Sequence, residues 1–172
     1  MIIWINGAFG IGKSTIAEML NSKIKNSHIY DPEQVGYFLW NNFPDSLKRK
    51  GDFQDINIGR NINYEIIKYM YHNYNGTLII PMTIVNKEYY NDIIGNLIND
   101  NIEIYHFILT ASKSTIKTRL INRGEVSNSW PEQQIDRCLD AFDNTITGIK
   151  IKTDNLSIES VTNLILKNIN LW

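Results

Sequence analysis

Eight residues near the start of the sequence have the spacing of a loop that binds phosphate groups. They read Gly7-Ala8-Phe9-Gly10-Ile11-Gly12-Lys13-Ser14, match the pattern G-x-x-x-x-G-K-[ST] and are followed by Thr15. Glycines let backbone N–H groups converge on an anion, a lysine at this place reaches the β- and γ-phosphates, and the Ser14 hydroxyl is a suitable Mg²⁺ ligand. No Asn-Lys-x-Asp guanine signature follows, so the pattern predicts binding of ATP with Mg²⁺.

Three arginines could stabilise the negative charge of a phosphoryl group during its transfer. Arg119 and Arg123 are four residues apart, so a helix would present both on one face, and residues 124–130 after them form a predicted loop. We expect a lid over about 123–131, with Arg137 closing over the phosphates from the next helix. The alternative is that these basic residues only offset the dipole at a helix C-terminus.

Asp31 is the first candidate on the acceptor side. It follows an apolar run and could accept the proton of an acceptor hydroxyl, or hold a water of the Mg²⁺ shell. The competing explanation is structural, because Asp31-Pro32-Glu33-Gln34 is also typical of a helix start, with an N-cap carboxylate and proline at the first helical position. Both roles are compatible with one residue.

The stretch 36–54 lacks clear periodicity and is too long for a plain connection, so it belongs to a candidate acceptor region over about 32–60. Its aromatic residues could line an apolar pocket or belong to the core. Thr83, after the third apolar run, could bind a substrate or cap a turn. The expected polar anchors for a substrate are Asp52, Gln54, Arg60 and Thr83.

Short apolar runs alternate with amphipathic stretches along the whole chain, which predicts an α/β fold with a parallel sheet covered on both faces. In the longest predicted helix, Ile58, Ile62, Ile66 and Met70 recur every four residues on one face. The expected strands are 2–6, 28–31, 77–80, 102–109 and 149–153, and the expected helices are 13–25, 55–74, 87–100, 112–123, 131–143 and 157–169.

Length and composition limit the classes of protein that need considering. A chain of 172 residues is the usual size of one domain, and its net charge of -1 gives no field that would recruit nucleic acid non-specifically. The single cysteine, Cys138, excludes an intrachain disulfide and is expected to be buried. No apolar run reaches the ~20 residues of a transmembrane helix, and the apolar start lacks a basic n-region, so we expect a cytoplasmic protein.

Several short stretches resemble one family across nearly the whole chain. They are Trp4-Ile5-Asn6-Gly7-Ala8-Phe9-Gly10, Tyr30-Asp31-Pro32-Glu33, Asp52-Phe53-Gln54, Pro81-Met82-Thr83-Ile84-Val85, Ala111-Ser112-Lys113, Asn128-Ser129-Trp130, Ile135-Asp136-Arg137-Cys138 and Thr153-Asp154-Asn155-Leu156-Ser157-Ile158. With these residues the sequence resembles the tunicamycin-resistance ATP-binding proteins of Gram-positive bacteria, within the adenylate-kinase-like and shikimate-kinase-like P-loop group. Only the glycine-rich loop among these stretches is generic.

The resemblance implies a three-layer P-loop NTPase fold, with a five-stranded parallel sheet in 2-3-1-4-5 order and a kinase-like lid. It also implies ATP binding and resistance to a uridine-containing lipidated nucleoside antibiotic, and it places Thr153, Asp154 and Asn155 at the adenine edge. Members of the family can carry a longer amphipathic C-terminal tail. The sequence given stops at Trp172, so peripheral membrane contact is not predicted.

The function expected from motif and resemblance together is ATP-dependent phosphotransfer to a hydroxyl of a small nucleoside-like molecule, plausibly tunicamycin. In this reading Lys13, Asp31, Arg119, Arg123 and Arg137 are the catalytic candidates. One alternative is a non-enzymatic protein that sequesters the drug in the presence of ATP. Another is a nucleoside or nucleotide kinase, for which Lys48, Arg49, Lys50 and Arg60 could bind an acceptor phosphate.

Overall fold

The computed structural model describes residues 1–48 and 52–170, and within them it contains the predicted parallel sheet. The strands are β1 (Ile2–Gly7), β2 (Ser27–Ile29), β3 (Thr77–Pro81), β4 (Ile104–Thr110) and β5 (Ile149–Lys152). They pair in parallel in the order β2-β3-β1-β4-β5, which confirms the order that the resemblance implied. Strand bounds differ from those expected by one or two residues, and β3 runs on to include Pro81.

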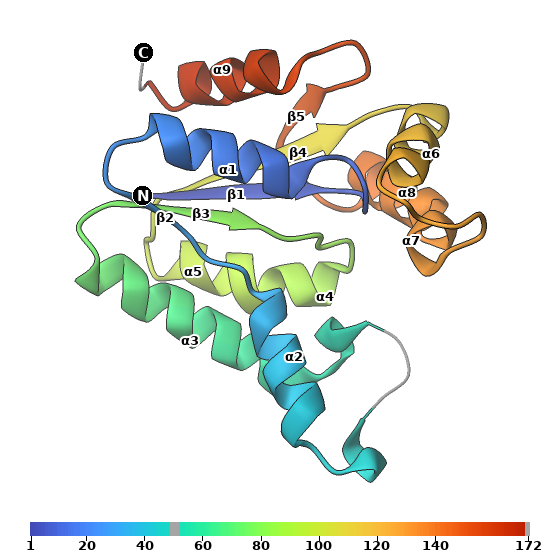
Figure 1. Cartoon of the computed structure of the whole chain (residues 1–172). Coiled ribbons are helices and arrows are strands. Elements are labelled where there is room, and N and C mark those ends of the chain that lie inside the picture. The colour runs from blue at the N-terminus through green and yellow to red at the C-terminus, as the bar shows by residue number, and fades with distance from the viewer. Residues whose placement is uncertain (49–51, 171–172) are drawn as a thin grey trace.

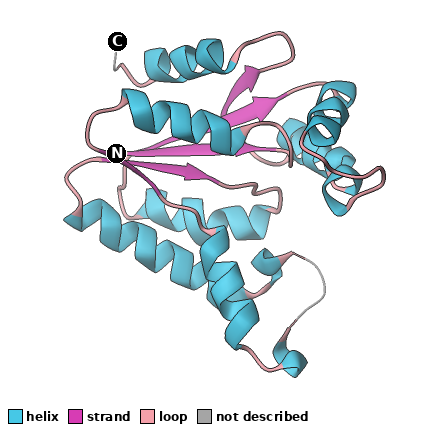
Figure 2. Cartoon of the chain, viewed as in Figure 1, coloured by secondary structure: helices cyan, strands magenta, loops and turns pink. Residues whose placement is uncertain are grey.

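Helices cover both faces of this sheet, so the molecule has three layers (Figure 1). Helices α1 and α9 lie on one face and α3 to α5 on the other, while α2 projects away from the sheet (Figures 1 and 2). The helices are α1 (Lys13–Lys23), α2 (Glu33–Asn42), α3 (Asn57–Asn73), α4 (Lys87–Tyr90), α5 (Asn96–Asn99), α6 (Lys113–Asn122), α7 (Trp130–Gln133), α8 (Ile135–Asn144) and α9 (Ile158–Asn168).

The central strands supply the middle of the core. All six residues of β1 are buried, because the strand lies between β3 and β4 and has helices above and below it. The edge strands differ from the expectation that every strand is covered on both faces. In β5 only Ile151 is buried, and His28 of β2 is exposed. An edge strand has a neighbour on one side only, which leaves part of it open to water.

The buried face of α3 is not the one that the isoleucine spacing predicts. Gly59, Asn63 and Ile67 are buried, whereas Ile58 is 47% exposed. Buried Asn63 accepts a hydrogen bond from the Tyr30 hydroxyl at 2.6 Å. Ile62, Ile66 and Met70 are half-buried, so the apolar stripe lies beside the most buried line of the helix, where Asn63 can be buried because it has a hydrogen-bond partner.

Three other stretches differ in local structure from what their sequence patterns indicate. The supposedly aperiodic residues 36–54 contain most of α2 and the short 3-10 helices η1 (Asp45–Leu47) and η2 (Phe53–Asp55). The helix expected over 87–100 is interrupted by a π-helical turn, η3 (Asn91–Gly95), and the one expected over 131–143 is divided into α7 and α8. Cys138 is buried on α8, as expected.

Among the helices formed by residues 1–48 and 52–170, none combines the length and apolar character needed to cross a membrane.

Candidate functional site

The glycine-rich loop joins the carboxyl end of β1 to the first turn of α1. Gly10 and Gly12 have positive φ angles of +79° and +108°, a conformation that side chains with a Cβ rarely adopt. A Cβ on Gly10 would also lie 2.5 Å from Cδ2 of Leu120, whereas one on Gly12 would meet nothing within 4 Å. Gly10 is thus required for both backbone angle and packing, and Gly12 for the backbone angle alone.

Lys13 places its ammonium group inside the curve of this loop. Its Nζ donates hydrogen bonds to the carbonyl oxygens of Gly7 and Ala8, both at 3.1 Å, and lies 5.5 Å from the centroid of the Phe9 ring. Burial lowers the pKa of Lys13 to about 8. Ser14 is exposed beside it in the first turn of α1, where its hydroxyl is accessible to a ligand of the loop.

A cavity of about 500 Å³, here called the nucleotide cavity, opens between the loop, α6 and the carboxyl end of β5. Arg119 crosses from α6 to this end of β5. It donates to the side-chain and backbone oxygens of Thr153, at 2.8 and 2.7 Å, and to the Ile11 carbonyl at 3.1 Å. The residues that line the cavity are Gly10, Ile11, Gly12, Thr15, Ile16, Leu109, Arg119, Arg123, Thr153, Leu156, Ser157, Ile158 and Val161.

The three residues that the resemblance placed at an adenine edge have different surroundings. Thr153 is buried and lines the nucleotide cavity. Asp154 does not line it. Its Oδ1 accepts hydrogen bonds from the Ser112 N–H and the Thr115 hydroxyl, both at 2.8 Å, and these bonds lower its pKa to about 2. Asn155 is exposed. Asp154 therefore holds the start of α6 in place.

The three arginines do not converge on one point. Arg123 lines the nucleotide cavity but pairs with Glu125, with 3.5 Å between Nη2 and Oε1, and its side chain is 62% exposed. Arg137 lies on the opposite side, with its Nη2 3.7 Å from Oδ2 of Asp52. Only Arg119 is held firmly, and it faces β5.

A second cavity of about 540 Å³, here called the acceptor cavity, lies on the other side of the loop. Trp130, the first residue of α7, meets the ring of Phe9 edge to face with 4.8 Å between centroids, so the loop and the predicted lid contact each other at this cavity. Aromatic rings make up most of the lining, which consists of Phe9, Glu33, Gly36, Tyr37, Trp40, Asp52, Phe53, Ile56 and Trp130.

Glu33 is the carboxylate at this cavity that the sequence reading missed. Burial raises its pKa, as do the negative charges of Asp31 and Asp52, while Lys13 acts in the opposite direction. Asp31 serves the helix start instead. Its Oδ1 accepts from the Glu33 N–H and its Oδ2 from Nε2 of Gln34, both at 3.0 Å. The clue in the sequence was the second acidic residue of Asp31-Pro32-Glu33. The first turn of α2 places this residue, Glu33, in the lining of the acceptor cavity.

The polar anchors expected for a substrate divide into one cavity residue and a supporting network. Asp52 lines the acceptor cavity, and burial raises its pKa. Buried Gln54 donates from Nε2 to Asp52 and to the Thr83 carbonyl, and the Thr83 hydroxyl donates to the Gly7 carbonyl at 2.8 Å. This chain of bonds joins the acceptor region to the loop, and neither Gln54 nor Thr83 lines the cavity.

Comparison with known proteins gives a consistent class of fold. No protein-family model matches the sequence, and no curated protein sequence is significantly similar to it. The tunicamycin resistance protein of Deinococcus radiodurans superposes with a TM-score of 0.83 and 26% identity, over 98% of this chain and 94% of that one. Shikimate kinase from Bacteroides thetaiotaomicron superposes with a TM-score of 0.67 and 14% identity, over 99% and 98% of the two chains.

A third example is the APS kinase of Mycobacterium tuberculosis, with a TM-score of 0.68 and 12% identity over 98% of this chain and 96% of that one. The chain therefore has the fold of P-loop kinases. Within that class it is similar over its whole length to a tunicamycin resistance protein, in agreement with the resemblance of its short sequence stretches.

Proposed function

We propose that this protein transfers the γ-phosphoryl group of ATP to a hydroxyl of a small nucleoside-like molecule, and that its acceptor is tunicamycin. The observation that carries the proposal is that the glycine-rich loop contributes to two cavities, through Gly10 and Gly12 to the nucleotide cavity and through Phe9 to the acceptor cavity, which Glu33 also lines. The Lys13 ammonium group is bonded to this same loop. A donor and an acceptor bound in these cavities would meet at the loop. In this way a bimolecular reaction becomes one between positioned groups.

The donor side is supported by the geometry of the loop. A phosphate chain fits the converging N–H groups at the start of α1, with Lys13 beside its terminal oxygens. The ribose and base would extend toward Arg119 and Thr153 in the nucleotide cavity. Mg²⁺ bound with ATP would be held through the exposed Ser14 hydroxyl and would neutralise phosphate charge. Among the described residues there is no cluster of acidic, histidine or cysteine side chains for a separate metal site.

On the acceptor side, Glu33 is the residue best placed to act as general base. Its raised pKa, caused by burial and by the negative charges around it, makes it a stronger base than an ordinary glutamate. The acceptor hydroxyl would give its proton to Glu33 as its oxygen bonds to the γ-phosphorus, while the bond to the bridging oxygen breaks and ADP leaves. Asp31 then becomes a positioning residue, because it holds the first turn of α2 that carries Glu33.

The nucleotide-kinase alternative receives less support from the described residues. Lys48 pairs with Asp45 at 3.0 Å, and Arg60 pairs with Asp92 and Glu88. These cations are therefore already matched by carboxylates, and neither lines the acceptor cavity. The other two residues of that expected basic site, Arg49 and Lys50, lie outside the described residues. The last residue of the sequence, Trp172, also lies outside them.

Mass spectrometry of tunicamycin after incubation with the protein and Mg-ATP tests the proposal. We expect a product that carries one added phosphate, formed about 100-fold or more slowly by a Glu33→Gln variant. Recovery of the unmodified drug would refute phosphotransfer, and 1:1 binding strengthened by ATP would then establish the sequestering alternative. Phosphorylation of a nucleoside monophosphate in place of tunicamycin would establish the kinase alternative.

A further inference from the structure

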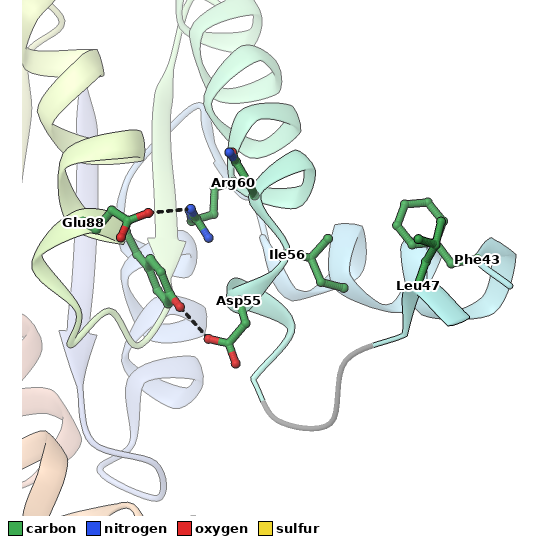
Figure 3. A pocket seen from close by; sticks show the side chains of 8 residues that line it. Phe43, Leu47, Asp55, Ile56, Arg60 and Glu88 are labelled. Carbon is green, nitrogen blue, oxygen red and sulfur yellow. Dashed lines mark hydrogen bonds and ion pairs between the residues drawn. The ribbon is translucent and has the colours of Figure 1, made fainter. Parts of the chain in front are cut away.

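Another cavity, of about 490 Å³, lies beside the acceptor cavity and has no part in the reaction proposed above (Figure 3). We call it the side cavity. Ile56 lines both cavities, so the two cavities adjoin each other at this residue. The volume is within the range of ~300–1,000 Å³ found for small-molecule sites. Its lining consists of Phe43, Leu47, Asp55, Ile56, Asn57, Arg60, Glu88 and Tyr89.

The two walls of the side cavity are chemically unlike. Figure 3 shows Phe43 and Leu47, from the end of α2 and from η1, on one side. Arg60 and Glu88, from α3 and α4, lie on the other, with Ile56 between the two walls. One wall is therefore hydrocarbon, and the other carries hydrogen-bonding groups.

The polar wall is held rigidly by bonds among its own members. The Arg60 side chain is only 5% exposed and donates to Asp92 at 2.8 Å and to Glu88 at 3.1 Å. Its guanidinium carbon lies 4.3 Å from the centroid of the Tyr89 ring, and the Tyr89 hydroxyl donates to Asp55 at 2.6 Å. A site whose polar groups are fixed before binding loses little entropy when a ligand arrives.

The atoms of this wall that can still form hydrogen bonds are mainly acceptors. Oδ2 of Asp55 and Oε2 of Glu88 accept no hydrogen bond from residues 1–48 and 52–170. Arg60, the one cation among the described lining residues, is already matched by two carboxylates, so the carboxylate of Asp55 leaves this described part of the wall with negative charge. Such a wall repels phosphate and carboxylate groups and favours hydroxyl groups, which can donate to it.

We propose that the side cavity is a second acceptor subsite, which binds a neutral, polyhydroxylated ring such as a sugar attached to the group that is phosphorylated. Such a ring has C–H groups that pack against Phe43 and Leu47 and hydroxyls that donate to Asp55 and Glu88. The inference rests on the proposed function, because it takes the acceptor cavity as the place where the reacting part of the acceptor binds. It adds the chemical class of the remaining part.

Calorimetric titration with tunicamycin, which carries sugar rings beyond its uridine, tests the subsite in the presence of a non-hydrolysable ATP analogue. The variants are Glu88→Gln on the polar wall and Leu47→Asp on the apolar wall, where Leu47 is 56% exposed and tolerates substitution. We expect each variant to bind tunicamycin at least tenfold more weakly, and the ATP analogue with unchanged affinity. The matched controls, Glu65→Gln on α3 and Leu164→Asp on α9, lie outside the cavity and should bind like the wild type.

The outcomes separate the two proposals. If the wild type binds tunicamycin and either folded variant binds it with the same affinity, the subsite is overturned and the proposed function stands. A wild-type protein that binds the ATP analogue but not tunicamycin refutes the proposed acceptor, and the subsite with it. Substitutions on opposite walls keep the test decisive if one variant fails to fold, and binding of the ATP analogue reports which variants are folded.

Discussion

The environment of Lys13 explains why this half-buried charge is suited to the proposed nucleotide site. Its ammonium group is held by two carbonyl oxygens and the face of Phe9, which replace water only in part, so burial lowers its pKa to about 8. The group is therefore charged at neutral pH but close to losing its proton. A phosphate chain in the loop would supply the negative charge that this position lacks.

Replacement of Lys13 tests the donor site directly. Lys13→Ala should reduce the affinity for Mg-ATP by at least 100-fold and leave the circular dichroism spectrum unchanged, whereas Lys25→Ala, on the exposed surface, should bind normally. In the wild type only the protonated lysine attracts phosphate, so the affinity should be constant below the pKa of about 8 and fall as the pH rises through it. Calorimetry between pH 6 and ~9.5 measures this. Affinity that does not vary with pH would contradict the assigned role.

Glu33 and Asp31 can be separated by their kinetics. Glu33→Gln should lower kcat by about 100-fold or more with unchanged affinity for ATP, because it removes the general base. Asp31→Ala should mainly lower stability, by about 1 kcal/mol, since it removes the hydrogen bonds that start α2. In the wild type kcat/KM should fall at acid pH, with its midpoint above the usual range for a glutamate because burial raises the pKa. The opposite ranking of the two variants in kcat would return the catalytic role to Asp31.

The role of a residue can be predicted from the sequence when it depends on residues that are close in the chain. The loop over residues 7–14 is such a case, because its glycines, lysine and serine act within one turn of chain. Thr83 is not, since its hydroxyl bonds to the carbonyl of Gly7, far away in the sequence. Glu33 was overlooked because a carboxylate in the first turn of a helix is ordinary, and only burial beside Asp52 and Lys13 makes it unusual.

At the scale of elements, the lid is more ordered than a flexible loop. Glu132 of α7 accepts the Asn128 N–H at 2.8 Å through one carboxylate oxygen and pairs with Lys117 of α6 at 2.8 Å through the other. A single side chain thus fixes the loop between α6 and α7 and joins the two helices. Sequence reading expected a loop here from its glycine and serine content, but the pairing that orders it is not a local pattern.

Removal of the Glu132 carboxylate should therefore loosen the lid. Glu132→Ala should change global stability little, because the ion pair is partly exposed to water. Hydrogen exchange at the Asn128 amide should become at least tenfold faster, while exchange at Gly124, whose N–H donates to the Ile121 carbonyl, should not change. Lys113→Ala, which breaks an ion pair to α8 instead, is the control. Equal rates at Asn128 in both variants would show that Glu132 does not order the loop.

The strand order shows which features of the fold can be predicted from the pattern of apolar and amphipathic stretches and which cannot. Alternation of apolar runs and amphipathic stretches predicts a parallel sheet, and the resemblance supplied its order. The extent of α2 was missed because Tyr37, Phe38 and Trp40 are exposed aromatic residues, which obscure the spacing of the buried Val35 and Leu39. Their helix depends on contact with Phe53, which a Cβ on Gly36 would meet at 2.6 Å. Tertiary packing of that kind is outside any local pattern.

At the scale of the whole molecule, the two cavities adjoin each other through the glycine-rich loop. Phe9 belongs to that loop, lies beside the Lys13 ammonium group, and packs against Trp130 in the lining of the acceptor cavity. A nucleotide that fixes the loop therefore also fixes one wall of the acceptor cavity. Binding at one cavity should then favour binding at the other, although no residue need contact both ligands.

This coupling can be measured as a change in affinity. A non-hydrolysable ATP analogue should raise the affinity for tunicamycin about fivefold or more, and tunicamycin should raise the affinity for the analogue by the same factor, because the two binding free energies are linked. Phe9→Ala should bring the factor close to one, since it removes the shared wall. Phe38→Ala, 62% exposed on α2 and outside the lining, should preserve the coupling. Titration of each ligand with and without the other gives all of these values. A factor of one in the wild type, or a factor below one because the ligands compete, would contradict the coupling.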